Sequence, residues 1–147
     1  MRCYKSLIRW VFIHFIFITN IGISQTIESG KEHGDSSTFN FEYSLQYVGS
    51  NTKIDPNYQY VLDYLIETLE KNKSWTVHIR GHVCCGPSQK LSDKRAKKVY
   101  CFLKKQGISE SRLSYKGYSD TAPLAFPEKT SEDERRNRRV DFIIKKN

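Results

Sequence analysis

One helix constrains this chain more than any other segment, because its apolar stripe and both of its ends can be read from the sequence. The stripe consists of Ala96, Val99 and Leu103. Ser92 is expected to cap the N-terminus of this helix, with Leu91 packing onto its first turn from outside. Gly107 is expected to end the helix, with Ile108 folding back onto Leu103. A helix that is apolar on one side only is buried against a second layer of structure.

The rest of the chain alternates between strand patterns, which have period two, and helical patterns. Strands are predicted at residues 39–46, 75–81, 112–117 and around 140–144. Asp55 and Pro56 predict the start of another helix, which runs to about Lys71, and a short helix is predicted near 131–136. The order β-α-β-α-β-(α)-β predicts an α+β fold, with two main helices packed on one face of a small mixed sheet.

The first 24 residues have the pattern of a secretory signal peptide. A basic start is followed by the apolar run Trp10–Ile18, and Gly22–Ser24 supplies small residues before a cleavage site ahead of Gln25. The apolar run is too short for a retained membrane anchor, so no transmembrane segment is expected after the signal is removed. Residues 25–38 are polar and rich in Gly and Ser, which indicates a flexible linker, and residues 39–147 form the expected domain.

The chain is basic, with 24 Lys and Arg against 16 Asp and Glu and a net charge of +8. Such a charge fits nucleic acid, a membrane surface or another polyanion equally well. Export favours the anionic cell wall, so no nucleic-acid partner is expected and most of the basic residues are interpreted as a solvated face. The sequence contains no Ser-His-Asp order, no paired catalytic carboxylates and no closed zinc spacing. We therefore expect no enzymatic activity, no cofactor and no resident metal.

Arg95 stands out by its position in the predicted helix. If the helix begins near Ser92, a cation lies in its first turn, where the helix dipole disfavours it. Together with the turn formed by residues 86–88, this arginine could receive a carboxylate or a phosphate. The alternative is a solvated arginine that is balanced by Asp93.

Four motifs in this order resemble the OmpA-like peptidoglycan-binding domain, the type found in the OmpA C-terminal region, Pal and MotB. The motifs are Ile79–His82, Leu91–Ala96, Ser111–Asp120 and Asn137–Asp141. The resemblance covers residues 39–147 and is strong after Trp75. It implies non-covalent binding to peptidoglycan through the diaminopimelate residue of the stem peptide. It also implies a periplasmic protein associated with the cell wall or outer membrane of a Gram-negative-type bacterium, with other envelope proteins as candidate partners.

The resemblance also implies which residues bind. Arg95 matches the arginine that holds the diaminopimelate carboxylate, and Arg138 matches a second arginine that supports the site. Cys84 stands where the family has the aspartate of a Gly-His-Thr-Asp turn, which holds the ligand amine. The backbone of Cys84, Cys85 and Gly86 is expected to line the pocket. A neutral thiol cannot attract an ammonium group as a carboxylate does.

The lost aspartate leaves two alternatives open. Another acid could take its place, and Glu42 and Asp55 are the candidates near the expected loop after the first strand. In the other alternative the wall site is degenerate, and the domain is a structural or interaction protein of the envelope that does not bind the wall.

The adjacent cysteines Cys84 and Cys85 allow three interpretations. We favour two reduced thiols in a tight turn over a vicinal disulfide, and both over a metal site with His78 and His82. Cys101 lies among lysines and is expected to be a partly exposed thiol.

Overall fold

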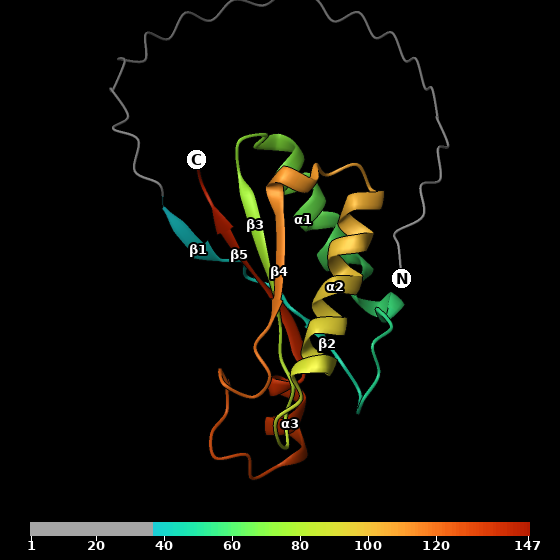
Figure 1. The fold of residues 1–147 in the computed structure, drawn as a ribbon, viewed down its shortest axis with the longest axis vertical. Coiled ribbons are helices and arrows are strands. Elements are labelled where there is room, and N and C mark those ends of the chain that lie inside the picture. The colour runs from blue at the N-terminus through green and yellow to red at the C-terminus, as the bar shows by residue number, and fades with distance from the viewer. Residues whose placement is uncertain (1–36) are drawn as a thin grey trace, which may run out of the picture. The chain divides into compact units, whose positions relative to one another are not determined.

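The last strand of the chain, β5 (Arg139–Lys145), organises a mixed sheet by pairing on both of its edges. It runs antiparallel to β1 (Thr38–Asn40) and β2 (Leu45–Gln46) on one edge and to β3 (Thr76–Gly81) on the other. β4 (Leu113–Gly117) lies parallel to β3 and completes the order β1-β5-β3-β4 (Figure 1). The predicted mixed sheet is therefore confirmed.

These elements come from a computed structural model that describes residues 37–147. The expected signal peptide at residues 1–24, and the expected linker up to residue 36, lie outside the described residues. Of the helices that the structure describes, none is both long and apolar enough to cross a membrane.

The first predicted strand is shorter than expected. Instead of one strand at 39–46, the chain forms β1 and β2 separated by four residues outside the sheet. The break includes Phe41, whose backbone N–H donates to Phe142 O at 2.9 Å while its ring packs into the core at 6.0 Å from the Phe142 ring. The Phe41 ring is therefore buried in the core at the point where the strand pairing with β5 is interrupted.

Two main helices cover one face of this sheet (Figure 1). A 3₁₀ turn, Pro56–Tyr58, leads into α1 (Gln59–Lys71), and the carboxylate of Asp55 accepts the Asn57 N–H at 2.9 Å as the predicted cap. The second helix, α2 (Gln89–Lys105), buries the predicted stripe of Ala96, Val99 and Leu103. Both helices close onto Val140, Phe142 and Ile144 of β5, which are fully buried.

The two ends of α2 differ in how well they were predicted. Its C-terminus is confirmed: Gly107 adopts a φ of +96°, and the Ile108 N–H donates to Leu103 O at 3.2 Å. Its N-terminus was placed wrongly, because the helix begins at Gln89 after Ser88 rather than at Ser92. The Ser92 hydroxyl is instead buried and accepts the Ser119 N–H at 3.1 Å, which ties the helix to the loop after β4.

The short third helix, α3 (Ser131–Asn137), confirms the helix predicted near 131–136. It follows a 3₁₀ turn at Glu110–Arg112, strand β4 and a long loop. A capping box starts it: Thr130 Oγ1 accepts the Asp133 N–H at 3.1 Å, and Asp133 Oδ2 accepts the Thr130 N–H at 3.0 Å. The chain leaves α3 at Arg138 and enters β5, so this cap helps to fix where Arg138 lies.

Candidate functional site

A pocket of about 470 Å³ opens beside the first turns of α2 and the loop after β3. The structure brings all five predicted site residues to its wall: Cys84, Cys85, Gly86, Arg95 and Arg138. Gly49 and Ser50, from the loop after β2, also line it. Of the described residues that line the pocket, two are arginines and none is acidic. The pocket wall is therefore positively charged.

Arg95 forms part of the inner wall, although its side chain is fully buried. Its guanidinium donates to three backbone carbonyls: Nε to Asn51 O at 3.0 Å, Nη1 to His82 O at 2.9 Å and Nη2 to Gly49 O at 2.6 Å. The ring of Tyr47 lies 4.7 Å from the guanidinium carbon, which makes a cation–π contact. These contacts join α2 to the loop after β2 and to the end of β3.

The sequence placed Arg95 in the wrong turn of the helix. Because α2 begins at Gln89, Arg95 lies in the second turn, where the dipole penalty that we expected does not apply. The alternative of a solvated arginine balanced by Asp93 is also wrong. Asp93 Oδ1 accepts from the Gly117 N–H at 2.7 Å and from Gln89 Nε2 at 3.2 Å.

Arg95 is a buried cation that, among the described residues, has no carboxylate partner. Burial lowers its pKa, the neighbouring Tyr47 opposes this effect, and the positive charge of Arg138 adds to it. Burial also raises the pKa of Tyr47 to about 12, so the phenol is neutral and offers no counter-charge. Buried charges are normally paired, so a cation in this state at a pocket wall is suited to receive an anion.

Arg138 directly follows α3 and also lines the pocket. Its Nη1 donates to Glu134 Oε2 at 2.9 Å and to Cys84 Sγ at 3.1 Å, and its Nε donates to Tyr47 O at 3.2 Å. Its side chain is 17% exposed, so unlike Arg95 it is open to solvent as well as to the pocket.

Glu134 is the residue at this site that the sequence analysis missed. Its spacing of four residues from Arg138 on a helix is the signal that could have indicated it. The two acids named instead lie elsewhere. Glu42 lines a different groove beside α1, and Asp55 caps the 3₁₀ turn that precedes α1.

Cys84 and Cys85 form a vicinal disulfide, so the favoured interpretation of two reduced thiols is wrong. No cysteine within residues 37–147 is free, so the expectation of a free thiol at Cys101 is wrong as well. The backbone turns sharply at this pair, with a φ of +61° at Cys85 and +112° at Gly86. The Cys85 N–H donates to Glu128 Oε2 at 3.0 Å, which holds the turn against the loop before α3.

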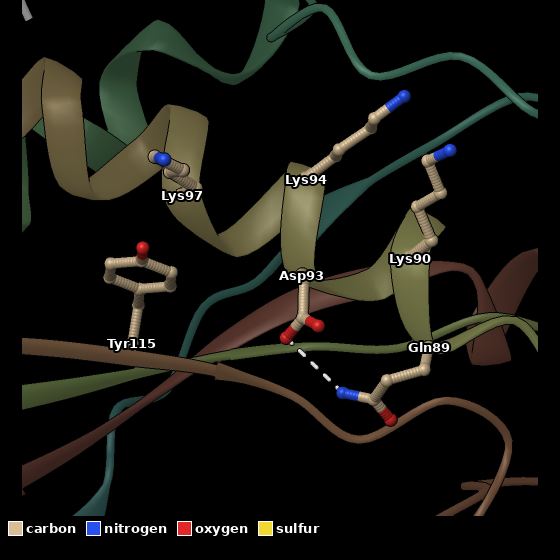
Figure 2. A pocket seen from close by; sticks show the side chains of 6 residues that line it. All are labelled: Gln89, Lys90, Asp93, Lys94, Lys97 and Tyr115. Carbon is tan, nitrogen blue, oxygen red and sulfur yellow. Dashed lines mark hydrogen bonds between the residues drawn. The ribbon is translucent and has the colours of Figure 1, made fainter. Parts of the chain in front are cut away.

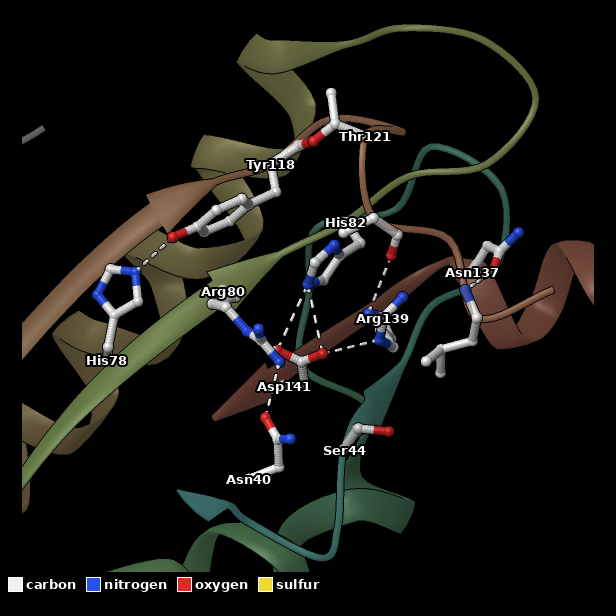
Figure 3. A network of polar contacts seen from close by, with 12 residues as sticks. Asn40, Ser44, His78, Arg80, His82, Tyr118, Thr121, Asn137, Arg139 and Asp141 are labelled. Carbon is white, nitrogen blue, oxygen red and sulfur yellow. Dashed lines mark hydrogen bonds and ion pairs between the residues drawn. The ribbon is translucent and has the colours of Figure 1, made fainter. Parts of the chain in front are cut away.

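The two histidines of the metal interpretation do not join these cysteines. His78 Nδ1 lies 2.8 Å from Ser114 Oγ and its Nε2 lies 3.1 Å from Tyr118 Oη, both along β4 and the loop after it. His82 Nε2 faces Asp141 at 3.3 Å (Figure 3). The metal site with His78 and His82 is therefore not assembled.

Asp141 is the carboxylate at the centre of a cluster of charged side chains from β3 and β5 (Figure 3). Arg80 Nε donates to its Oδ1 at 2.6 Å and Arg139 Nε donates to its Oδ2 at 2.9 Å. Burial alone would raise the pKa of Asp141, but hydrogen bonds from His82 and Arg80 outweigh it and lower the pKa to about 2. Burial lowers the pKa of His82, against the hydrogen bond to Asp141. The cluster supplies its own carboxylate, in contrast to Arg95.

A larger hollow of about 660 Å³ lies on the outer face of α2 (Figure 2). It is lined by Gln89, Lys90, Asp93, Lys94, Lys97 and Tyr115. The ammonium groups of Lys90 and Lys94 point away from Asp93 in Figure 2. It contains none of the predicted site residues, and its lysines belong to the face expected to be solvated.

Comparison with known proteins places the fold. The peptidoglycan-associated lipoprotein from Burkholderia pseudomallei is 19% identical, with a TM-score of 0.63 over 69% of this chain and 88% of that one. The C-terminal domain of Helicobacter pylori MotB is 20% identical, with a TM-score of 0.66 over 71% and 85%. The cell wall anchor of the T6SS from Pseudomonas aeruginosa is 24% identical, with a TM-score of 0.57 over 69% and 75%. These likenesses show that the α+β fold is that of an OmpA-like domain.

Sequence comparison assigns the family. A curated relative, the Photosystem I P700 chlorophyll a apoprotein A2 of Gloeobacter violaceus, is 33% identical over 105 residues. This stretch is 65% of the present chain but 12% of that protein, so the chain spans a small part of the relative it matches. The OmpA family matches residues 46–138, which include α1, β3, α2, β4, α3 and every residue that lines the pocket. This chain therefore belongs to the OmpA family.

Proposed function

We propose that this protein binds peptidoglycan non-covalently in the periplasm, through the diaminopimelate residue of the stem peptide, and that it catalyses no reaction. One observation carries the proposal: Arg95 is buried without a carboxylate partner among the described residues, at the wall of a pocket that a second arginine also lines. The names of two structural neighbours, a peptidoglycan-associated lipoprotein and a cell wall anchor, support the same ligand.

The ligand carboxylate would supply the counter-charge that Arg95 lacks. Three of the N–H groups of Arg95 are occupied by carbonyls, and a guanidinium has five, so two remain for a ligand. Arg138 would add a second cation, and the Cys84–Gly86 backbone lines the same pocket. A hydrogen bond between a guanidinium and a carboxylate is among the stronger polar contacts in proteins.

The ligand amine needs an acid, and we propose Glu134 in place of the family aspartate. The sulfur of Cys84 is in a disulfide, so it carries no charge. Glu134 gathers with both sulfur atoms, all within 4.8 Å of one another, and is partly exposed beside the pocket. An ammonium group here would meet the carboxylate that at present contacts only Arg138 among the described residues.

The first test measures retention of the purified protein on diaminopimelate-type sacculi. We expect Arg138→Gln to weaken retention by roughly ten-fold to a hundred-fold, because a charge-assisted contact contributes about 1.5–3 kcal/mol. Arg136→Gln is the matched control, since Arg136 is an exposed arginine on α3, two residues before Arg138, and does not line the pocket. Unchanged retention of Arg138→Gln, or failure of the wild type to bind, would show that this is not the wall site.

The second test addresses the ligand. Stem peptides with diaminopimelate at the third position should release the protein from sacculi. Peptides with lysine there, which lack the second carboxylate of that residue, should release it far less. Equal release by both peptides would contradict the assignment of diaminopimelate to Arg95 and Arg138.

A second candidate is a degenerate wall site on an envelope interaction protein, which the cysteine at position 84 favours. Cys84→Asp restores the family residue, and Cys84→Ser is its control because both changes break the disulfide. A large gain in wall retention for Cys84→Asp alone would favour degeneracy. No gain would mean that Glu134 or another acid already serves the amine.

Export is proposed on the sequence pattern of residues 1–24, followed by the linker at 25–38 and the domain at 39–147. Sequencing of the N-terminus of the protein recovered from the cell envelope should begin at Gln25. Recovery of the intact N-terminus from the cytoplasm would contradict this assignment.

A further inference from the structure

The sulfur atoms of the vicinal cysteines have no part in the proposed wall binding, and they lie beside Glu134, the acid proposed above for the ligand amine. The sulfur atoms of Cys84 and Cys85 and a carboxylate oxygen of Glu134 all lie within 4.8 Å of one another. We propose that these three residues form a binding site for a thiophilic divalent cation, closed while the cysteines are bonded to each other and opened when they are reduced.

The distances suit a single ion. Zinc lies about 2.3 Å from thiolate sulfur and about 2.0–2.2 Å from a carboxylate oxygen, so ligands that share one tetrahedral ion are about 3–4 Å apart. A cluster within 4.8 Å reaches that spacing by small side-chain rotations once the sulfur atoms separate. Cys85 is exposed, which gives an ion a path from solvent, and the adjoining pocket leaves room for a water molecule as fourth ligand.

The loop does not depend on the disulfide for its position. The Cys85 N–H is held by Glu128, the Val83 N–H donates to Ser119 O at 2.9 Å, and the Ser88 N–H donates to Ser119 Oγ at 2.8 Å. Glu134 stands on a helix whose start is fixed by its capping box. These hydrogen bonds do not involve the sulfur atoms, so we expect the loop and α3 to keep their positions after reduction. The three ligands then stay close enough to bind one ion.

Charge also fits a divalent ion. The Arg138 guanidinium donates to Cys84 Sγ, which favours the thiolate form of a reduced Cys84. Two thiolates, the Glu134 carboxylate, the Arg138 guanidinium and a divalent cation together carry no net charge. The ion, its three ligands and Arg138 would therefore form a neutral group.

Opening the site requires two electrons from a dithiol reductant. The two reductant thiols form their own disulfide, the bond between Cys84 and Cys85 breaks, and each cysteine gains a proton. The cation then replaces both thiol protons, which are released to solvent, and the carboxylate joins as the third ligand. In the oxidised protein both sulfur atoms lack the charge that a thiophilic ion needs.

The test uses Cd²⁺, whose bonds to thiolate give an ultraviolet charge-transfer absorption. The protein is prepared with the substitutions Cys3→Ser and Cys101→Ser, so that Cys84 and Cys85 are its only cysteines. It is reduced with dithiothreitol, freed of reductant without oxygen and titrated. We expect the absorption to rise until one equivalent of Cd²⁺ has been added to the reduced protein. The oxidised protein should show no such absorption. Absorption of equal strength in both forms, or in neither, would overturn the proposal.

Two glutamates of α3 then test the third ligand. Glu134→Gln should weaken Cd²⁺ binding by at least about ten-fold, since even outer partners of metal ligands contribute that much. Glu132→Gln is the matched control: Glu132 also pairs with an arginine of its own helix, Arg135, but lies outside the cluster. Equal weakening by both changes, or none by Glu134→Gln, would overturn the role of Glu134. Neither readout involves the cell wall, so the outcome is independent of the proposed function.

Discussion

Arg95 and Arg112 make nearly the same hydrogen bonds in two different places. Each donates to three backbone carbonyls; for Arg112 these are Leu69 O at 2.7 Å, Asn72 O at 2.8 Å and Trp75 O at 2.8 Å. Each guanidinium thereby closes a loop onto a neighbouring element. Judged by contacts alone, both are structural arginines.

Their surroundings separate them. Arg112 is partly exposed and lies at the C-terminal end of α1, where the helix dipole and water both favour a cation. Arg95 has neither advantage, because it is fully buried and its acceptors are loop carbonyls. Arg95 also lines a pocket, where in our proposal a ligand carboxylate supplies the missing counter-charge. Solvation and access, rather than the number of hydrogen bonds, distinguish the candidate binding arginine.

The largest effect is expected where a buried counter-charge is already present. Asp141→Asn removes the carboxylate shared by Arg80, His82 and Arg139 and should lower the free energy of unfolding by about 3–5 kcal/mol. Asp63→Asn, at an exposed position on α1, should change it by less than about 0.5 kcal/mol. Denaturant unfolding measures both; a similar small loss in the two variants would mean that the cluster is not held by its carboxylate.

The next largest effects are expected when Arg112 or Arg95 is replaced by methionine. Arg112→Met should lower the free energy of unfolding by about 2–3 kcal/mol, because three carbonyls lose a charged donor. Arg95→Met should cost less, about 1 kcal/mol, because it also removes a buried cation that lacks a carboxylate. Wall retention should show the reverse, lost in Arg95→Met and kept in Arg112→Met. Loss of retention in both variants, or in neither, would contradict the assignment of a binding role to Arg95 and a structural role to Arg112.

Acid should remove the contribution of Asp141 in a defined range. Its pKa in the folded protein is about 2, below its ordinary value of 3.8, so its stabilisation is complete above about pH 4 and is lost as the pH falls toward 2. The wild type should therefore lose about 2 kcal/mol more than Asp141→Asn between pH 4 and pH 2. Urea unfolding of both proteins at each pH measures this difference. Equal losses of stability in the two proteins would show that Asp141 is not the group responsible.

The smallest effect separates the two pocket arginines. Thr130→Ala removes the side-chain cap of α3 and should destabilise the protein by about 1 kcal/mol. Because α3 carries Glu134 and ends at Arg138, hydrogen exchange should accelerate in this helix but not in α2 around Arg95. Thr121→Ala, in the loop after β4, is the control and should leave exchange in α3 unchanged. Faster exchange in both helices would mean that they unfold as one unit.

Most of the fold followed from local pattern. The stripe of α2, the glycine that ends it, the cap at Asp55 and the alternation along β3 and β5 each reflect interactions within a few residues, so the sequence contains them. The start of α2 did not follow, because Ser92 is both a common cap residue and a good partner for Ser119, which is distant in the sequence. Local rules do not choose between those two uses.

The candidate site divides in the same way. The sequence by itself placed Arg95, Arg138 and the Cys84–Gly86 turn in one family pattern, because the order and spacing of motifs survive changes elsewhere in the chain. Only the tertiary structure buried Arg95 among carbonyls, joined Cys84 to Cys85 and brought Glu134 beside them. Burial and pairing depend on which segments meet across the fold, and that information is not carried by any one of the segments.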